Sequence, residues 1–163
     1  MANKTKEFVQ QYATTTDDKR KPTPDPAEDN AFFPSAYSLE QYTAETTDFS
    51  TLATEDTYTG GQWKVLVIGT EERYMPMQNG TFFSTGNHPV ETLLPLYHML
   101  KAGFGVDVAT ISGNPVKFEW WAFPSGDEAV SDAWNATKSA FKHPEKLSDV
   151  VAQGLDDYAA VFI

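Results

Sequence analysis

Two apolar runs separated by one amphipathic segment constrain the fold of this chain more than any other feature of its sequence. Trp63–Gly69 and Val106–Ser112 each predict a buried strand, because their apolar residues run on without the alternation of a half-exposed strand. The segment between them is long enough to hold a helix. Strand, helix and strand in this order predict a right-handed parallel crossover, and therefore an α/β fold.

The helix expected inside this unit has clear local signals. Pro89 suits the first helical turn, and Gly103 is a suitable C-terminal stop. Pro95 lies inside the helix and is expected to kink it or to cost a hydrogen bond. Side chains at helical spacing predict its buried face: Val90, Leu93, Leu94, Tyr97 and Leu100.

Further elements are expected around this crossover. Residues 70–87 are predicted to form a long loop with a turn at Asn79-Gly80, and residues 115–124 a short extended stretch. Helices are expected at residues 127–141 and 145–153.

The chain closes on the apolar run Tyr158–Ile163, which predicts a buried central strand. In open α/β folds, ligands and nucleophiles lie at the carboxyl ends of such strands. We therefore interpret the chain as the amino-terminal half of an enzyme-like fold, truncated after a central strand.

The first third of the chain differs in character. Residues 1–30 are polar and rich in proline, whereas residues 31–62 carry aromatic side chains without a lasting helical or strand period. This pattern favours an extended arm that lies on a globular body. The predicted organisation is thus a polar tail and aromatic wrapping arm at residues 1–62, followed by the α/β domain at residues 63–163.

Charge and composition exclude several classes of function. A formal net charge of −11 repels phosphate backbones and anionic lipid, so neither a nucleic-acid surface nor a membrane surface is expected. The chain contains no cysteine, which excludes disulfides, thiolate zinc sites and a cysteine nucleophile within these residues. With no apolar leader at its start and no apolar stretch of about 20 residues, the sequence predicts a cytoplasmic protein.

Four segments together are specific to one family. They are Ala27–Ser35 (AEDNAFFPS), Phe83–Leu96 (FSTGNHPVETLLPL), Val108–Gly113 (VATISG) and Lys117–Ala122 (KFEWWA). In this order they resemble the HchA-type heat-shock proteins of the PfpI superfamily, which are described as glyoxalase III, protein deglycase and holding chaperone. The resemblance covers roughly residues 27–163.

The resemblance implies a flavodoxin-like three-layer sandwich with a mostly parallel sheet, commonly as a homodimer. It also implies activity without a cofactor on small α-oxoaldehydes such as methylglyoxal, or on glycated proteins. The family nucleophile is a cysteine in a strand-to-helix elbow, followed by a histidine. Both lie beyond Ile163 in the family pattern, so this chain is expected to be inactive alone.

Glu91 is the candidate catalytic residue that the chain retains. On the residues alone, an acid in a first helical turn is explained by the helix dipole. The family motif implies more, because its glutamate faces the cysteine and relays protons. Such a role requires that burial and a neighbouring thiolate raise the pKa of the carboxyl group.

No metal site is expected. Some family members bind a metal through two histidines and a glutamate, and the resemblance places Leu100, Gly105 and Thr137 at those positions. None of these side chains is a strong zinc ligand. The acidic pairs Glu71-Glu72 and Asp156-Asp157 are interpreted as solvated acidic surface.

Other residues leave alternatives open. His88 suits a cap or turn, or a contribution to the pocket or dimer surface, whereas His98 and His143 suit structural or exposed positions. The pairs Phe32-Phe33 and Trp120-Trp121 suit a core or dimer interface, or a surface for unfolded protein clients. A holding chaperone and an inert truncated product therefore remain as alternatives to the enzyme.

Overall fold

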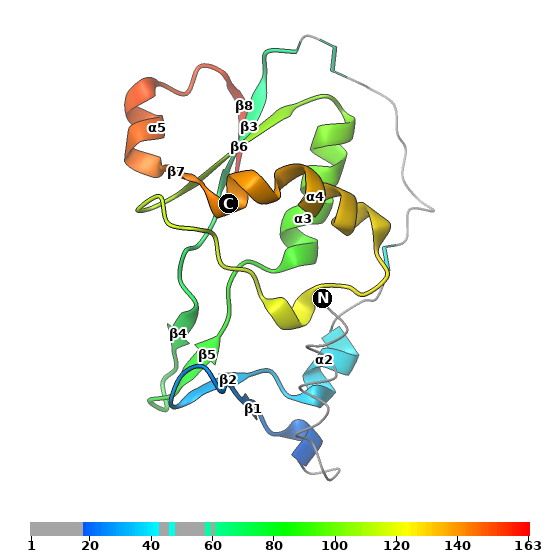
Figure 1. Ribbon diagram of the computed structural model, residues 1–163, viewed down its shortest axis with the longest axis vertical. Helices are drawn as coiled ribbons and strands as arrows, with labels where there is room; N and C mark the ends of the chain where they lie inside the picture. Colours follow the sequence, from blue (N-terminus) through cyan, green and yellow to red (C-terminus); the bar gives the residue numbers. More distant parts are fainter. Residues whose placement is uncertain (1–17, 43–45, 48–57, 60) are drawn as a thin grey trace.

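The computed structural model describes residues 18–42, 46–47, 58–59 and 61–163 (Figure 1). The predictions for residues 1–17 and for Phe49 lie outside the described residues. The described chain forms two sheets, one parallel and one mixed.

The parallel sheet has the strand order β7-β6-β3-β8. Its strands are β7 (Glu145–Lys146), β6 (Gly105–Thr110), β3 (Lys64–Ile68) and β8 (Tyr158–Phe162). Strand β3 pairs with β6 on one side and with β8 on the other, in both cases parallel. The predicted crossover and the α/β class are therefore confirmed.

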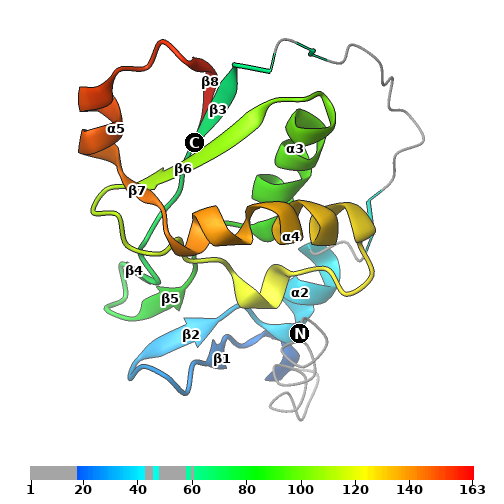
Figure 2. The same ribbon diagram turned by 45° about the horizontal axis from the view of Figure 1, so that its top comes forward.

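Helices cover both faces of this sheet, as the two ribbon views show together (Figures 1 and 2). Helices α3 (Pro89–Lys101) and α4 (Glu128–Lys142) pack against one face and against each other. That face holds the main core, in which the buried residues are Val67, Leu93, Leu96, Val108, Val116, Phe118, Val130, Ala133 and Phe141. Helix α5 (Leu147–Gln153) covers the other face with the smaller cluster Leu66, Ala109 and Val150.

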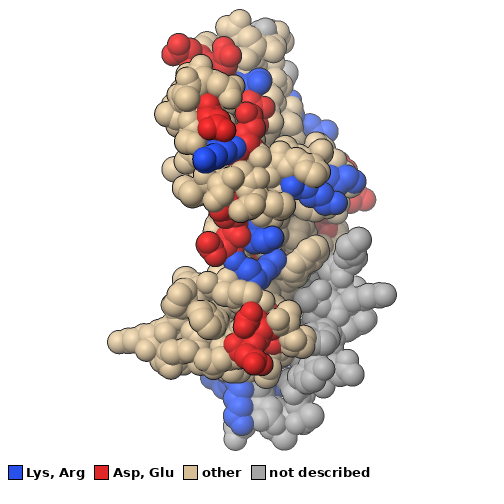
Figure 3. Space-filling model, turned by 60° about the vertical axis from the view of Figure 1, so that its left-hand side comes forward, with Lys and Arg blue, Asp and Glu red and all other residues tan. Residues whose placement is uncertain are grey.

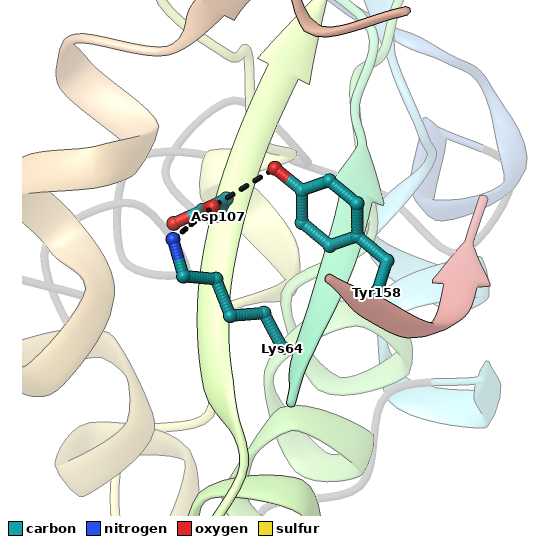
Figure 4. Close-up of polar contacts among 3 residues, drawn as sticks. All are labelled: Lys64, Asp107 and Tyr158. Carbon is teal, nitrogen blue, oxygen red and sulfur yellow. Dashed lines mark hydrogen bonds and ion pairs between the residues drawn. The ribbon is translucent and has the colours of Figure 1, made fainter. Parts of the chain in front are cut away.

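On the face that α5 covers, a polar cluster lies at the amino ends of the strands (Figure 4). The ammonium group of Lys64 lies 2.9 Å from the Asp107 carboxylate, and the Tyr158 hydroxyl donates to the same carboxylate oxygen at 2.9 Å. Burial and the neighbouring Asp107 carboxylate raise the pKa of Tyr158 to about 12. This cluster joins three parallel strands at the end opposite to the one where sites are found in such folds.

The second sheet has the order β1-β2-β5-β4. Its strands are β1 (Thr23–Pro24), β2 (Ala31–Phe33), β5 (Phe82–Ser84) and β4 (Tyr74–Pro76). The expectation of a long loop at residues 70–87 is therefore wrong, because β4 and β5 form an antiparallel hairpin there. The turn expected at Asn79-Gly80 is confirmed, and Gly80 has a φ of +82°.

The expectation that residues 31–62 lack regular structure is also wrong at its start. Strand β2 pairs with β5 across about fifty residues, and helix α2 (Ala36–Tyr42) follows it. The short helix η1 (Asp18–Arg20) precedes both. Strands of two or three residues are too short to show a period in the sequence. Their pairing partners are also remote, so no local pattern indicates them.

Four smaller expectations need correction. The stretch 115–124 turns into the 3₁₀ helix η2 (Trp120–Ala122), and the helix expected at 145–153 begins only after strand β7. Strand β8, expected as a buried central strand, pairs only with β3 within the described residues, and its Val161 is 48% exposed. Leu96 is fully buried on α3 although the predicted face omitted it.

Candidate functional site

The candidate site is built where helix α3 begins, beside the carboxyl end of β3. Pro89 and Val90 open the helix, and Glu91 follows in its first turn with an exposed side chain. Acidic groups are favoured here because the first helical amides present a partial positive charge. The predicted place of Glu91 in the first turn is confirmed, while its catalytic role stays a prediction.

His88 is the N-cap of α3. Its Nδ1 accepts the backbone N–H of Glu91 at 3.4 Å, so the cap alternative for this residue is confirmed. Burial lowers the pKa of His88, and the nearby Glu91 charge offsets part of that change. A lowered pKa keeps the imidazole neutral at neutral pH, and only the neutral ring can accept this bond.

Asn87 ties the start of α3 to two other segments. Its side-chain Oδ1 accepts from Thr70 N at 3.2 Å, and its Nδ2 donates to Thr70 O and to Lys117 O at 3.1 and 2.7 Å. Its backbone pairs with Phe118 in an isolated parallel bridge. One amide side chain thereby joins the end of β3, the start of α3 and the segment before η2.

Gly86 is needed where these segments touch. Its φ is +156°, and a Cβ atom at this position would lie 2.7 Å from the carbonyl oxygen of Lys117. Backbone cannot yield as the end of a flexible side chain does, so only glycine fits this close approach.

Glu119 is a buried acid beside this turn, with 7% of its surface exposed. Thr85 Oγ1 donates to Glu119 Oε1 at 2.7 Å. Burial is the largest influence and raises the pKa of Glu119; the Glu91 charge raises it further, while Thr85 and Arg73 act in the opposite direction. The structure therefore brings a second carboxyl group close enough to Glu91 for their charges to interact.

Arg73 completes the support of the turn. Its guanidinium donates to the carbonyl oxygens of Thr85 and Phe118 at 3.1 and 2.8 Å, and the Thr85 N–H donates to Arg73 O at 2.8 Å. Burial lowers the pKa of Arg73, yet the group stays charged because an arginine pKa lies so high. The arginine holds backbone rather than a ligand.

The residues weighed as metal ligands do not form a metal site. Thr137 donates its hydroxyl to Ala133 O at 2.6 Å inside α4. Within the described part of the chain, no cluster of three or more histidine, cysteine or acidic side chains is placed to hold a metal. Glu71 lies at the surface, where it accepts from Ser112 N and Oγ at 3.1 and 2.6 Å, and these hydrogen bonds lower its pKa to about 2.

The aromatic pairs divide between core and surface. Trp121 is buried and donates to Ser84 O at 3.3 Å, and Phe33 packs on the same cluster. Trp120 is 47% exposed and lies against Phe123. The core alternative therefore holds for Trp121 and Phe33.

The remaining histidines lie away from the helix start. His98 lies in the last turn of α3 with its ring edge-on to Tyr97, and His143 is the exposed C-cap of α4. Both positions fit the structural or exposed roles expected of them.

Three residues of the site escaped the sequence reasoning: Arg73, Asn87 and Glu119. Asn87 and Glu119 lie inside two of the quoted family segments, so the signal was present without a role attached. Arg73 has no such signal, because its partners are carbonyl oxygens that any residue supplies.

Comparison with known proteins supports the resemblance. The chain is 58% identical over 147 residues to "Protein/nucleic acid deglycase HchA" of Staphylococcus aureus strain JH9, and equally so to the protein of that name in strain Newman. The match covers 88% of this chain and 50% of each relative, so the chain spans about half the length of the curated relatives it matches. No family model matches the chain. Over the matched residues, the chain is similar to these HchA proteins.

One solved crystal structure also matches in part, with 25% identity and a TM-score of 0.46 over 63% of this chain and 41% of the other. In the described residues, no helix has the length and apolar character that a membrane crossing requires.

Proposed function

We propose that the protein containing this chain is a deglycase that removes early α-oxoaldehyde adducts from proteins, with Glu91 moving protons in its site. The observation that carries this proposal is the position of Glu91, which has an exposed carboxyl group in the first turn of α3, within the segment Phe83–Leu96 by which the sequence resembles the family. The names of those relatives supply the reaction class.

The chemistry divides between this chain and residues outside it. The 163 residues contain no cysteine, so the family's thiol must come from elsewhere in the protein. At the former aldehyde carbon of the adduct, the carbon–nitrogen bond breaks, the amine leaves with a proton, and the thiolate bonds to the carbon to give a hemithioacetal. Proton transfer rearranges the hemithioacetal to a thioester, and water hydrolyses that thioester to a hydroxy acid and the free thiol. Glu91 is exposed in this chain, so the burial that this role requires has to come from the residues that bring the thiol. His88, in its neutral form, caps the helix turn from which Glu91 would take and return the proton.

The same chemistry extends to free aldehydes. With methylglyoxal, addition of the thiol, proton transfer and hydrolysis by water give lactate, so a glyoxalase III activity without glutathione or any cofactor forms part of the proposal. The proposed substrates are thus small aldehydes and their adducts on proteins.

The relatives are named for nucleic acid as well. This chain, however, carries a net charge of −11, and acidic and basic side chains are interspersed on the face in Figure 3. We therefore assign proteins and free aldehydes as substrates. The proposal places the complete protein in the cytoplasm, and it takes the homodimer from the family resemblance.

The test uses the protein expressed from its complete gene. Lactate release from methylglyoxal without glutathione and regeneration of free amines on a glycated protein are both expected. Glu91→Gln should reduce both by about 100-fold or more, the scale of a lost general acid–base group. Full activity in Glu91→Gln, with an unchanged unfolding curve, would contradict the role of Glu91.

A holding chaperone is the second candidate, favoured by the exposed apolar side chains of the β4–β5 hairpin. Met75, Met77 and Phe82 are 47%, 43% and 37% exposed. Such a surface suits unfolded clients because flexible methionines adapt to varied partners. Suppression of client aggregation should survive Glu91→Gln and fall in the double variant Met75→Ser/Met77→Ser. If the double variant suppresses aggregation as well as the wild type, the hairpin does not bind clients.

A further inference from the structure

Glu119 has no part in the proposed chemistry, although it is the buried acid of the site. A carboxyl group that is 7% exposed loses most of its hydration, which is costly unless hydrogen bonds replace it. Thr85 supplies such a bond at 2.7 Å, from the turn that leads into α3. A buried acid at this position therefore suggests a specific role for its hydrogen bond to Thr85.

The contacts of Glu119 converge on that turn. Its side chain accepts from Thr85, and its backbone N–H donates to Asn87 O at 3.0 Å. Glu119 therefore bonds to the residues on both sides of Gly86. Arg73 also donates to the bend, through Thr85 O. The turn between Thr85 and His88 is thus fixed by partners distant in sequence.

Glu91 depends on this turn because its own local cap is weak. The bond from Glu91 N to His88 Nδ1 is 3.4 Å long, near the limit for such a bond. A shift of the turn would move the start of α3 and the Glu91 carboxyl group with it. The Glu119 backbone bond to Asn87 O ties this residue to the chain four residues before Glu91, and the Glu91 charge raises the pKa of Glu119.

We propose that Glu119 is a positioning residue for Glu91: by accepting the Thr85 hydroxyl, it fixes the turn from which α3 starts and so the place of the Glu91 carboxyl group. The inference rests on the proposed function, in which Glu91 moves protons. It assigns to Glu119 the role of a hydrogen-bond acceptor, with no contact to the substrate.

The first test compares variants that keep or remove this bond in the complete protein. Glu119→Ala and Thr85→Val each remove it and should lower kcat by about 10- to 100-fold with KM little changed, as expected for a misplaced catalytic group. Glu119→Gln and Thr85→Ser keep an acceptor and a donor, and should stay within about threefold of wild type. The double variant Glu119→Ala/Thr85→Val should be no slower than either single variant, because the pair acts as a unit.

Thr137→Val is the matched control. It removes another buried threonine hydroxyl, the one bonded to Ala133 O in α4, and should lower stability while leaving kcat unchanged. A wild-type kcat in Glu119→Ala, or an equal loss in Glu119→Gln and Glu119→Ala, would overturn the proposal. If either alanine or valine variant fails to fold, the Thr85→Ser and Glu119→Gln pair still decides, since both must retain activity.

The second test needs no activity and separates this inference from the proposed function. The Glu119 carboxyl group is titrated by carbon NMR in the wild type and in Glu91→Gln. Because the Glu91 charge raises the pKa of Glu119, Glu91→Gln should lower that pKa, and Glu128→Gln should leave it unchanged. An equal pKa in all three proteins would overturn the shared placement of the two acids. If Glu91→Gln is active but lowers this pKa, only the proposed function fails.

Discussion

Helices α3 and α4 begin in similar ways and are held in different ways. Each has an N-cap side chain that accepts the N–H of the residue three positions later, and each has a glutamate in its first turn. For α4, the buried Asp127 accepts from Val130 N at 3.0 Å, and its other oxygen accepts from Thr47. For α3, His88 accepts at 3.4 Å.

The difference shows which helix start is fixed by local hydrogen bonds and which by hydrogen bonds to remote segments. The start of α4 follows the common rule, in which aspartate caps the helix locally. The start of α3 uses a weak cap and relies on Asn87, Glu119 and Arg73, whose partners lie in other segments. Departures from local rules concentrate at functional sites, and this departure lies at the turn that precedes Glu91.

The largest expected effect comes from removing the remote support. Asn87→Ala loses three side-chain hydrogen bonds to Thr70 and Lys117, and at about 1 kcal/mol for each bond should lower the free energy of unfolding by about 2–3 kcal/mol. Urea unfolding measures this change. Asn87→Asp keeps the acceptor for Thr70 N but sets a carboxylate oxygen against the carbonyl oxygens of Thr70 and Lys117, so it should lose at least as much stability as Asn87→Ala. If Asn87→Ala lowered the free energy of unfolding by less than the cap substitution Asp127→Ala, the start of α3 would be held by its local cap.

The local cap of α4 should have a smaller effect. Asp127→Ala removes the acceptor for Val130 N and should cost about 1–2 kcal/mol of stability, whereas Asp127→Asn should cost less because an asparagine caps equally well. The same urea experiment compares the two. Equal losses in both variants would assign the effect to the aspartate charge rather than to the cap.

These contrasts explain what the sequence could and could not predict. The start and end of α3 were predictable because Pro89 and Gly103 act on their own neighbours. The small sheet was not, because β2 pairs with β5 about fifty residues away and neither strand is long enough to show a period. For the site, the motif indicated Glu91, but the roles of Glu119 and Arg73 depend on hydrogen bonds that exist only in the folded chain.

The smallest expected effect concerns pH and the cap of α3. Burial lowers the pKa of folded His88 below its usual 6.5, so the unfolded chain binds a proton more readily. The stability contributed by the neutral ring is present above pH 6.5 and is lost as the pH falls from there through the folded pKa. His88→Asn keeps a capping side chain that does not titrate.

Thermal unfolding at pH 8 and at pH 5.5 checks this prediction. The wild type should lose more stability than His88→Asn between these two conditions, by a fraction of a kcal/mol. Identical losses in the two proteins would show that the His88 pKa is not lowered in the folded state.

The most direct test of the account compares the two first-turn glutamates in the complete protein. Glu91→Gln and Glu128→Gln each remove a negative charge from the first turn of α3 or α4, so a helix-dipole contribution of about 0.3–1 kcal/mol is lost in both. The account predicts that kcat/KM for release of lactate from methylglyoxal falls by about 100-fold or more in Glu91→Gln and stays at wild type in Glu128→Gln. Equal activities in the two variants would reduce Glu91 to a helix-capping charge and contradict the account.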